Sequence, residues 1–244
     1  MSSYFSKLSI GLMSLSIMGA TSCGIFGGSG GSAELRVLLA APDVSSVNVL
    51  IDNTVVNASL GYGANTGYMD VTSGTRHLQV VPVGATTAIV DESVNVPSSG
   101  EVTVIVEGVA PNIVGLVLTD NNTAPASGTA ELRLVNAAPG STAIPNTTTD
   151  VYVVPTNGSL TPPPTVAALA YGQASGYQSL TITPLDSSVV TQDYSVFFTE
   201  PGNTKVEAGS GTISFASGQN STMVLLWQSG AQNQLTVTSL ADLN

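Results

Sequence analysis

Two residue types that often carry out chemistry occur once each in this 244-residue chain. Cys23 is the only cysteine and His77 the only histidine. A Ser-His-Asp triad needs a histidine at its centre, but His77 alternates with Leu78 and Val80 in a pattern that places it on the solvent side of a strand. A zinc site needs three or four His, Cys or carboxylate ligands. The sequence therefore predicts neither a catalytic residue nor a metal site.

Carboxylates are more plentiful, because the chain has 16 Asp and Glu residues. A glycoside hydrolase needs two carboxyl groups about 5–10 Å apart, whereas a calcium site needs only oxygen ligands. Partial sites of the second kind lie at Asp52-Asn53, Asp91-Glu92 and Asp120-Asn121-Asn122. No motif singles out any of these acids. A carboxylate-dependent glycan hydrolase and a calcium-stabilised surface adhesion module therefore remain alternatives, and no cofactor is predicted.

Two charged pairs stand at matched places in the chain, Glu34 with Arg36 and Glu131 with Arg133. Residues two apart on a strand face the same side. We therefore predict a structural ion pair within each of these strands.

Aromatic residues make up only 5% of the chain, so an aromatic-lined sugar cleft is not indicated. Four tyrosines fall at matched places: Tyr62, Tyr68, Tyr171 and Tyr177. We expect their rings to pack at strand ends with the hydroxyl groups in water, and a shared ligand surface is the alternative. Trp227, the only tryptophan, is expected in a core or between domains.

The chain repeats itself after about a hundred residues, which is the size of a small domain rather than of a solenoid unit. Residues 33–42 (AELRVLLAAP) return as residues 130–139 (AELRLVNAAP). Further matched blocks are 60–63 with 169–172 and, near the end of each copy, 104–107 (VIVE) with 224–227 (VLLW). The chain is thus predicted to be two copies of one domain.

Apolar and polar residues alternate in short runs bounded by turn residues, as in Val47-Asn48-Val49. Many short strands of this kind are typical of an all-β sandwich. The sequence predicts two tandem antiparallel β-sandwich domains of immunoglobulin-like or transthyretin-like type. Their expected bounds are residues 33–120, here named repeat 1, and residues 130–244, named repeat 2, with a linker at 121–129.

Residues 1–22 have the order of a secretory signal peptide, with Lys7, an apolar run over residues 8–20 and small residues after it. The segment Ala20-Thr21-Ser22-Cys23 resembles the lipobox of bacterial lipoproteins. That resemblance implies that Cys23 is acylated and becomes the first mature residue. Cleavage after Ser22 by an ordinary signal peptidase, or a free thiol, are the alternatives.

The segment after Cys23 is expected to be a flexible tether. Residues 24–32 read GIFGGSGGS, and a chain of this composition spans roughly 15–18 Å. In the lipoprotein resemblance, Gly24 does not match the Asp that retains some lipoproteins at the inner membrane. The outer membrane, on its periplasmic or surface face, is therefore the expected location.

The charge of the chain limits its partners. Its formal net charge is −11, with only five Lys and Arg residues. Binding to phosphate backbones and electrostatic docking on anionic lipid both need clustered basic residues. We therefore exclude nucleic acid as a partner.

The repeats resemble a bacterial family known as a domain of unknown function, whose repeats open with Val-Arg-Val-Val-His-Ala-Ser-Pro-Asp-Ala. The segments that carry the resemblance are residues 35–43, 132–140 and 150–153, with Tyr62-Gly63 and Tyr171-Gly172. The family's histidine is replaced by Leu39 and Asn136, so chemistry based on it is absent. The resemblance implies a β-sandwich and an envelope location, and it implies no activity.

These features together predict a non-catalytic cell-envelope protein, attached to the membrane by a lipid on Cys23. Its expected role is that of a binding or spacer module for an envelope protein or polysaccharide. The ligand-binding residues are not predicted.

Overall fold

The computed structural model describes residues 32–140, 148–183, 191–228 and 231–243. The fold is all-β, as predicted, because every regular element in these ranges is a strand. No helix in this part of the chain is long and apolar enough to cross a membrane. The signal peptide, Cys23 and most of the tether lie outside the described residues.

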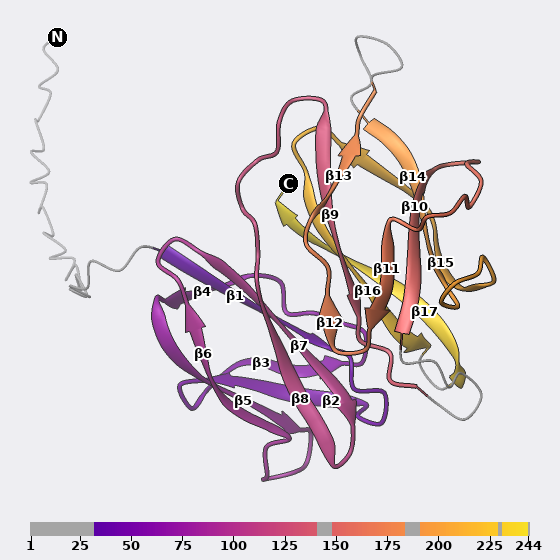
Figure 1. Cartoon of the computed structure of the whole chain (residues 1–244). Helices are drawn as coiled ribbons and strands as arrows, with labels where there is room; N and C mark the ends of the chain where they lie inside the picture. The colour runs from indigo at the N-terminus through magenta and orange to yellow at the C-terminus, as the bar shows by residue number, and fades with distance from the viewer. Residues whose placement is uncertain (1–31, 141–147, 184–190, 229–230, 244) are drawn as a thin grey trace, which may run out of the picture.

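Repeat 1 forms two four-stranded sheets (Figure 1). Its strands are β1 (Ser32–Leu39), β2 (Ser46–Ile51), β3 (Thr54–Gly61), β4 (Met69–Thr72), β5 (Gly74–Pro82), β6 (Val90–Val96), β7 (Glu101–Val109) and β8 (Asn112–Thr119). Inner sheet 1 has the order β4-β1-β7-β8, and outer sheet 1 has the order β3-β2-β5-β6.

Repeat 2 has the same plan with longer strands near its end. Its strands are β9 (Thr129–Asn136), β10 (Thr148–Pro155), β11 (Val166–Ala170), β12 (Gln173–Ala174), β13 (Gln178–Thr181), β14 (Thr191–Thr199), β15 (Val206–Ala216), β16 (Asn220–Gln228) and β17 (Ala231–Leu243). Inner sheet 2 has the order β12-β9-β16-β17, with β13 also paired to β9. Outer sheet 2 has the order β11-β10-β14-β15.

The strand pairs are antiparallel, as predicted, apart from one parallel pair in each inner sheet. The first strand of each repeat runs parallel to a late strand, β1 with β7 and β9 with β16. A parallel pair needs a long crossover connection, and here the rest of each sandwich supplies it. In both pairs the arginine lies opposite a threonine, Arg36 opposite Thr103 and Arg133 opposite Thr222.

Three apolar clusters order the four sheets into layers. One cluster fills the space between the two sheets of repeat 1, with Val37, Val104 and Leu78 among its members. A second does the same in repeat 2. The third joins the two inner sheets, and its buried members are Leu38, Ala40, Ile105, Val135, Ala137, Val224, Leu226 and Leu240. The inner sheets are therefore covered on both faces.

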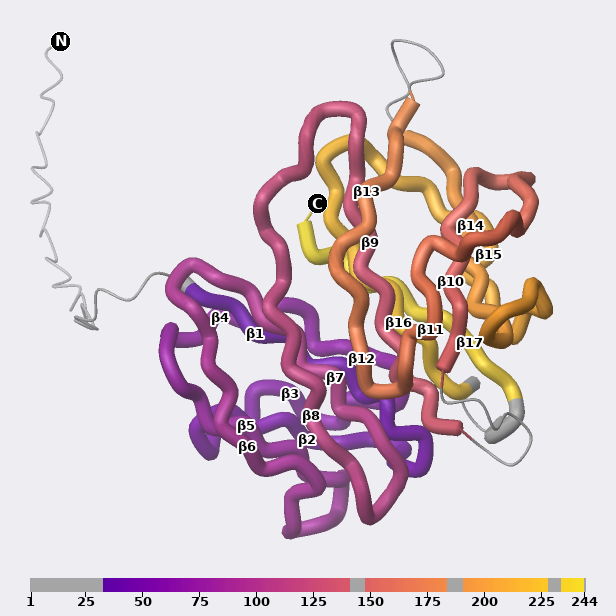
Figure 2. The backbone as a smooth tube through the Cα atoms, viewed as in Figure 1, coloured from indigo at the N-terminus to yellow at the C-terminus, as the bar shows by residue number. Residues whose placement is uncertain are grey.

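The two repeats lie against each other along this third cluster. Figure 2 shows the chain leaving the indigo and magenta repeat 1 through one connection and entering the orange and yellow repeat 2. Because both faces of β7 are covered, all residues from Val102 to Gly108 are buried. Polar residues at the alternate positions of β7, Thr103 and Glu107, consequently face the other repeat instead of water.

Candidate functional site

His77 lies on the exposed face of outer sheet 1, as predicted. Its side chain is 40% exposed, and its Nε2 lies 2.6 Å from Asp91 Oδ1. The hydrogen bond to His77 is the main reason why the pKa of Asp91 lies below its usual value. Ser93 stands opposite His77 in the strand register and is exposed. These three residues lie on an open sheet face, where nothing would exclude water from a reacting group.

The acids considered for calcium or glycan chemistry are mostly engaged with protein donors. Asp52 accepts hydrogen bonds from Arg76 Nη1 and from the His77 amide, both at 3.0 Å. Glu92 turns inward over Gly115, and burial raises the pKa of its carboxyl. Asp120 is buried in an ion pair, described below. Within the described ranges, no three His, Cys, Asp or Glu residues gather as a metal site would require.

The ion pairs predicted within strands are wrong, because both arginines reach across to the other repeat. Arg36 on β1 pairs with Asp242 on β17, with 2.6 Å between Nη2 and Oδ1. Its Nη1 donates to the carbonyl oxygen of Ala241 at 2.7 Å. Its Nε and Nη2 donate to the Thr103 hydroxyl at 3.0 and 2.8 Å. That hydroxyl in turn donates to Asp120 Oδ2 at 2.5 Å.

The second arginine makes the same contacts in the opposite direction. Arg133 on β9 pairs through Nη2 with Asp120 Oδ1, at the end of repeat 1. Its Nη1 donates to the carbonyl oxygen of Thr119 at 3.0 Å, and its Nε donates to the Thr222 hydroxyl at 2.9 Å. Thr222 then donates to Asp242 Oδ2 at 2.6 Å.

Two tyrosines complete this arrangement. Tyr68 donates to Asp120 Oδ2 at 2.7 Å, and Tyr177 donates to Asp242 Oδ2 at 2.8 Å. Each arginine guanidinium lies over the ring of one of them, at 4.3 Å for Tyr68 and 5.0 Å for Tyr177. The expectation that these hydroxyl groups are in water is therefore wrong, since they donate hydrogen bonds to aspartates at the repeat ends. Burial is the main cause that raises the pKa of both phenols.

These eight residues form what we call the inter-repeat network. Its members are Arg36, Tyr68, Thr103 and Asp120 from repeat 1 and Arg133, Tyr177, Thr222 and Asp242 from repeat 2. The side chains of both aspartates are 0% exposed and those of the arginines 3% and 5%. Two positive and two negative charges balance, and each aspartate accepts three hydrogen bonds from side chains of the network. A nucleophile or general base needs a reactive atom open to substrate, so the network is suited to holding the repeats together rather than to catalysis.

The sequence did contain a signal for the missed aspartates. Asp120 follows Leu118-Thr119 directly after β8, and Asp242 follows Leu240-Ala241 near the end of β17, so the pattern Leu-x-Asp stands at the end of each repeat. This match lies at the ends of the two repeats, and its meaning depends on the contact between them. Alternation within one sandwich does not reveal such a contact.

At the other end of the interface, Tyr62 reaches across from repeat 1. Its hydroxyl donates to the carbonyl oxygen of Trp227 at 2.7 Å, and burial raises the pKa of this phenol to about 12. Trp227 is 4% exposed, in agreement with its expected burial. The corresponding tyrosine of repeat 2, Tyr171, also has a pKa raised to about 12, by burial first and the nearby Glu107 second.

The structure corrects the predicted alignment of the closing strands by one residue. Because Arg36 lies opposite Thr103 and Arg133 opposite Thr222, Glu107 corresponds to Leu226 and not to Trp227. Glu107 therefore occupies a place that is apolar in repeat 2. It is 3% exposed, its Oε2 has no hydrogen-bond partner, and burial raises its pKa to about 7.

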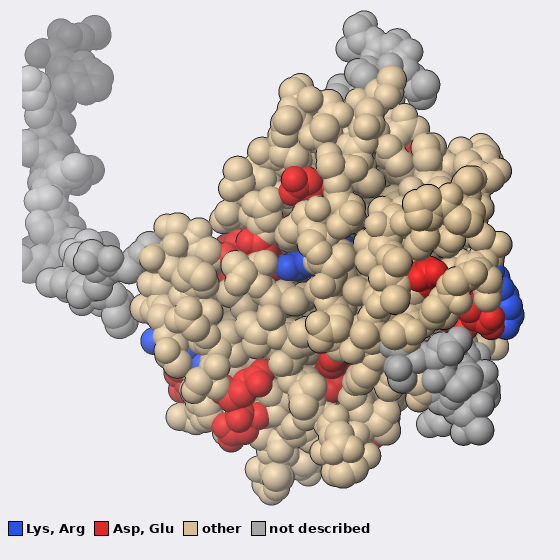
Figure 3. Space-filling view, in the orientation of Figure 1, with Lys and Arg blue, Asp and Glu red and all other residues tan. Residues whose placement is uncertain are grey.

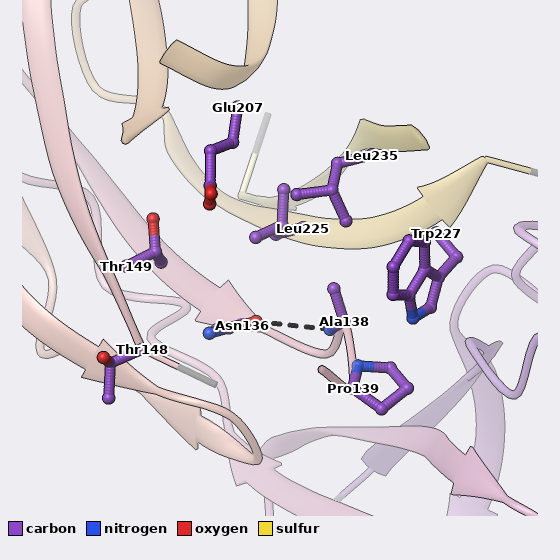
Figure 4. A pocket seen from close by; sticks show the side chains of 9 residues that line it. All are labelled: Asn136, Ala138, Pro139, Thr148, Thr149, Glu207, Leu225, Trp227 and Leu235. Carbon is purple, nitrogen blue, oxygen red and sulfur yellow. Dashed lines mark hydrogen bonds between the residues drawn. The ribbon is translucent and has the colours of Figure 1, made fainter. Parts of the chain in front are cut away.

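The described residues line one small cavity and two larger surface hollows. One of about 10 Å³ lies at the end of the repeat 2 core, which is enough for a water molecule. Figure 4 shows Thr149 and Glu207 on one side of it and Trp227 and Leu235 on another. Two hollows that open on the surface of repeat 1 are larger, at about 190 and 250 Å³. The first is lined partly by Met69, Val71 and Arg76, the second partly by Glu34, Glu101 and Asn122.

Comparison with known proteins finds one family model that matches the first part of the chain. Residues 33–145 match a family described as a domain of unknown function, DUF4397. A DUF4397 domain spans residues 33–145. The matched segment contains all of repeat 1, the linker and β9, so the DUF4397 domain includes Arg36, Asp120 and Arg133 of the inter-repeat network.

The other comparisons add no function. No curated protein sequence matches the chain. A similar solved structure is the crystal structure of CBMbc (family CBM26) from Eubacterium rectale Amy13K in complex with maltoheptaose. It is 14% identical, covers 84% of this chain and 96% of its own, and has a TM-score of 0.26. At that score nothing about the ligand of this chain follows from the likeness.

Proposed function

We propose that this chain is a non-catalytic, lipid-anchored protein of the bacterial cell envelope, in which two β-sandwiches act as one rigid binding or spacer unit. The inter-repeat network is the observation that carries the proposal. The described residues include only four Lys and Arg residues, and two of them, Arg36 and Arg133, join the repeats. A buried network of this kind fixes one relative orientation, because any other would leave charges unpaired.

The exposed surface is suited to uncharged partners. Figure 3 shows a mainly tan face on which charged side chains form small, separate groups. Chains of sugars or polar protein surfaces are bound through many neutral hydrogen bonds rather than through charge. An envelope protein or polysaccharide is therefore the partner class that we propose.

The rigidity can be tested with two spin labels. The segment 33–244 contains no cysteine, so Ser93→Cys and Thr212→Cys place labels on exposed residues of the two outer sheets. We expect a single narrow distance distribution by electron paramagnetic resonance. Adding Arg133→Met should broaden it, because one ion pair of the network is lost. A broad distribution in the otherwise unchanged segment would contradict the rigid unit.

The absence of catalysis needs its own experiment. The segment 33–244 would be incubated with panels of glycans and esters and with solubilised envelope polymers. We expect retention of a partner without turnover. Turnover that disappears after a single Asp or Glu substitution would replace the binding module with a hydrolase.

The membrane anchor predicts the behaviour of a Cys23→Ala variant. The full-length variant should move from the membrane fraction to the soluble fraction, since it lacks the thiol that would be acylated. Ser22→Ala, which keeps both Cys23 and a small residue before it, should remain with the membrane. Membrane retention of Cys23→Ala that requires detergent for release would contradict the anchor.

A further inference from the structure

The surface by which the two repeats hold each other is self-complementary. Arg36 of repeat 1 contacts Asp242 of repeat 2, and Arg133 of repeat 2 contacts Asp120 of repeat 1. Each carboxylate is also held by the tyrosine and the threonine of its own repeat. Residue i contacts j and j contacts i, which is the defining property of an isologous interface between two copies of one subunit.

The apolar part of the interface follows the same rule. The strand registers make Leu38 correspond to Val135 and Ile105 correspond to Val224. Their neighbours Ala40 and Ala137 are identical, and all six residues belong to the cluster that joins the inner sheets. The apolar residues of the interface thus correspond between the two repeats, as the charged residues do.

The linker adds backbone contacts to repeat 2 but no side chain to the inter-repeat network. The Asn121 amide donates to the Tyr177 hydroxyl at 3.2 Å, and Asn220 Nδ2 donates to the carbonyl oxygens of Asn121 and Thr123 at 2.7 and 3.0 Å. The eight side chains of the inter-repeat network all lie outside residues 121–129. The linker ends are close, since Asn121 Nδ2 donates to Glu131 Oε2 at 2.9 Å. Each repeat also has an apolar cluster of its own. The charged and apolar parts of the contact surface therefore do not depend on the two repeats belonging to one chain.

We propose that this surface also binds a second copy of the chain, with repeat 1 of each molecule held by repeat 2 of the other. Such an exchanged dimer keeps the contacts of both networks and adds no unsatisfied charge. In the unaltered chain the dimer competes with closure of one molecule on itself, which the linker favours by keeping the repeats at a high effective concentration. Exchange should therefore dominate when closure within one chain no longer forms the ion pairs between the repeats.

Two complementary variants of the segment 33–244 create that condition. The first, Arg36→Met with Asp120→Asn, neutralises the repeat 1 charges. When that chain closes on itself, Arg133 and Asp242 lose their partners across the interface and keep only their mutual contact, 4.0 Å between Nη2 and Oδ2. The second, Arg133→Met with Asp242→Asn, does the converse. In a mixed exchanged dimer, one interface is fully native and the other fully neutral, so no buried charge lacks a partner.

Native mass spectrometry of the mixture decides between the outcomes. We expect a heterodimer that exceeds each homodimer by more than about tenfold, with a melting temperature above that of either variant alone. The unaltered chain should remain mainly monomeric under the same conditions. A mixture that stays monomeric would overturn the proposal. Homodimers of one variant as abundant as the heterodimer would also overturn it, because charge pairing across the repeats would then not select the partner.

A second experiment tests the proposal without these substitutions, so that it does not depend on whether the variants fold. A protease site inserted in the otherwise unaltered chain between Ala124 and Ser127, in the exposed part of the linker, allows the folded protein to be cut. Cut protein of natural isotope content is then mixed with cut protein labelled with heavy isotopes. We expect the halves to remain associated and hybrid complexes to appear. Halves that separate after cleavage, or that never exchange, would contradict a surface able to accept another copy.

Discussion

The Arg133→Met variant is expected to lose about 3–5 kcal/mol of unfolding free energy, because the substitution leaves two buried aspartates with a single arginine, and Asp120 keeps only the longer contact to Arg36 at 3.8 Å. Arg133 pairs with Asp120, whose side chain is 0% exposed. Urea denaturation of the segment 33–244, followed through the fluorescence of Trp227, measures the loss. This tryptophan is the only one in the chain and contacts Tyr62 of repeat 1 through its carbonyl oxygen, so it reports on the interface.

A matched substitution at the surface provides the control. Arg76 also pairs with an aspartate, but its side chain is 25% exposed and that of Asp52 is 48% exposed. Exposed ion pairs contribute at most about 1 kcal/mol, so Arg76→Met should cost less than Arg133→Met by a clear margin. Similar losses in the two variants would mean that the buried pair does not stabilise the contact between the repeats.

A double variant separates the missing contact from the unpaired charge. Arg133→Met with Asp120→Asn removes both charges of one pair while the threonine and tyrosine donors near Asp120 keep an oxygen to bind. Its loss should be smaller than that of Arg133→Met alone, because no buried charge remains without a partner. A loss equal to the sum of the two single losses would show that the charges act independently.

The all-β fold could be predicted because the alternation of apolar and polar residues within each repeat indicates which residues form the core of that sandwich. Alternation along β2 and β5 places Val47, Val49, Leu78 and Val80 inward, and the structure buries all four. The repeat of residues 33–42 at 130–139 also corresponds to equivalent strands, β1 and β9. These properties are local, so one strand is enough to reveal them.

The contact between the repeats was harder to predict, because alternation says which face is apolar and not whether the polar face is later covered. Besides the matched Leu-x-Asp residues, a signal of the contact is the nearly continuous apolar run of β1 and β7, which is typical of strands buried on both faces. Val37-Leu38-Leu39 and Val104-Ile105-Val106 are such runs, and Leu38 and Ile105 both face the other repeat. That signal indicates a partner surface without naming the partner, so Asp120 and Asp242 could not be assigned to the arginines.

The predicted alignment of residues 104–107 with 224–227, which is wrong by one residue, also hid a difference between the repeats. Matching 104–107 with 224–227 places Glu107 opposite Trp227, whereas the strand register places it opposite Leu226. A slip of one residue moves every side chain to the opposite face of its sheet. The incorrect match therefore concealed the fact that repeat 1 has a carboxyl group where repeat 2 has a leucine.

Glu107→Leu is expected to stabilise the protein at pH 8. The carboxyl is buried at the interface, and its Oε2 has no hydrogen-bond partner. Its Oε1 lies so near Gly172 of repeat 2 that a Cβ there would be 3.0 Å away. Burial raises the pKa of Glu107 to about 7 from an ordinary value of 4.5, and a difference of this size corresponds to about 3 kcal/mol.

The sign of the pH dependence follows from which state holds the proton more tightly. Below pH 4.5 the carboxyl is protonated in both the folded and the unfolded chain, so it costs little. Between 4.5 and 7 the unfolded chain releases its proton first, and stability falls as the pH rises. Above pH 7 the folded protein carries the unpaired charge and the full penalty is present. The advantage of Glu107→Leu over the unaltered chain should therefore be largest at pH 8 and should shrink as the pH is lowered towards 4.5.

Two further variants separate the charge from the side-chain chemistry. Glu107→Gln keeps the shape but not the charge, so it should follow the same pH trend as Glu107→Leu. Glu200→Gln should show the opposite sign, because hydrogen bonds from Lys205 and Asn203 lower the pKa of Glu200 and stabilise its charged form in the folded protein. Melting temperatures measured across the pH range for all four proteins decide the matter. If the Glu107 variants differ from the unaltered chain equally at every pH, the carboxyl reaches a donor or water when ionised, and Leu226 then differs from Glu107 in packing alone.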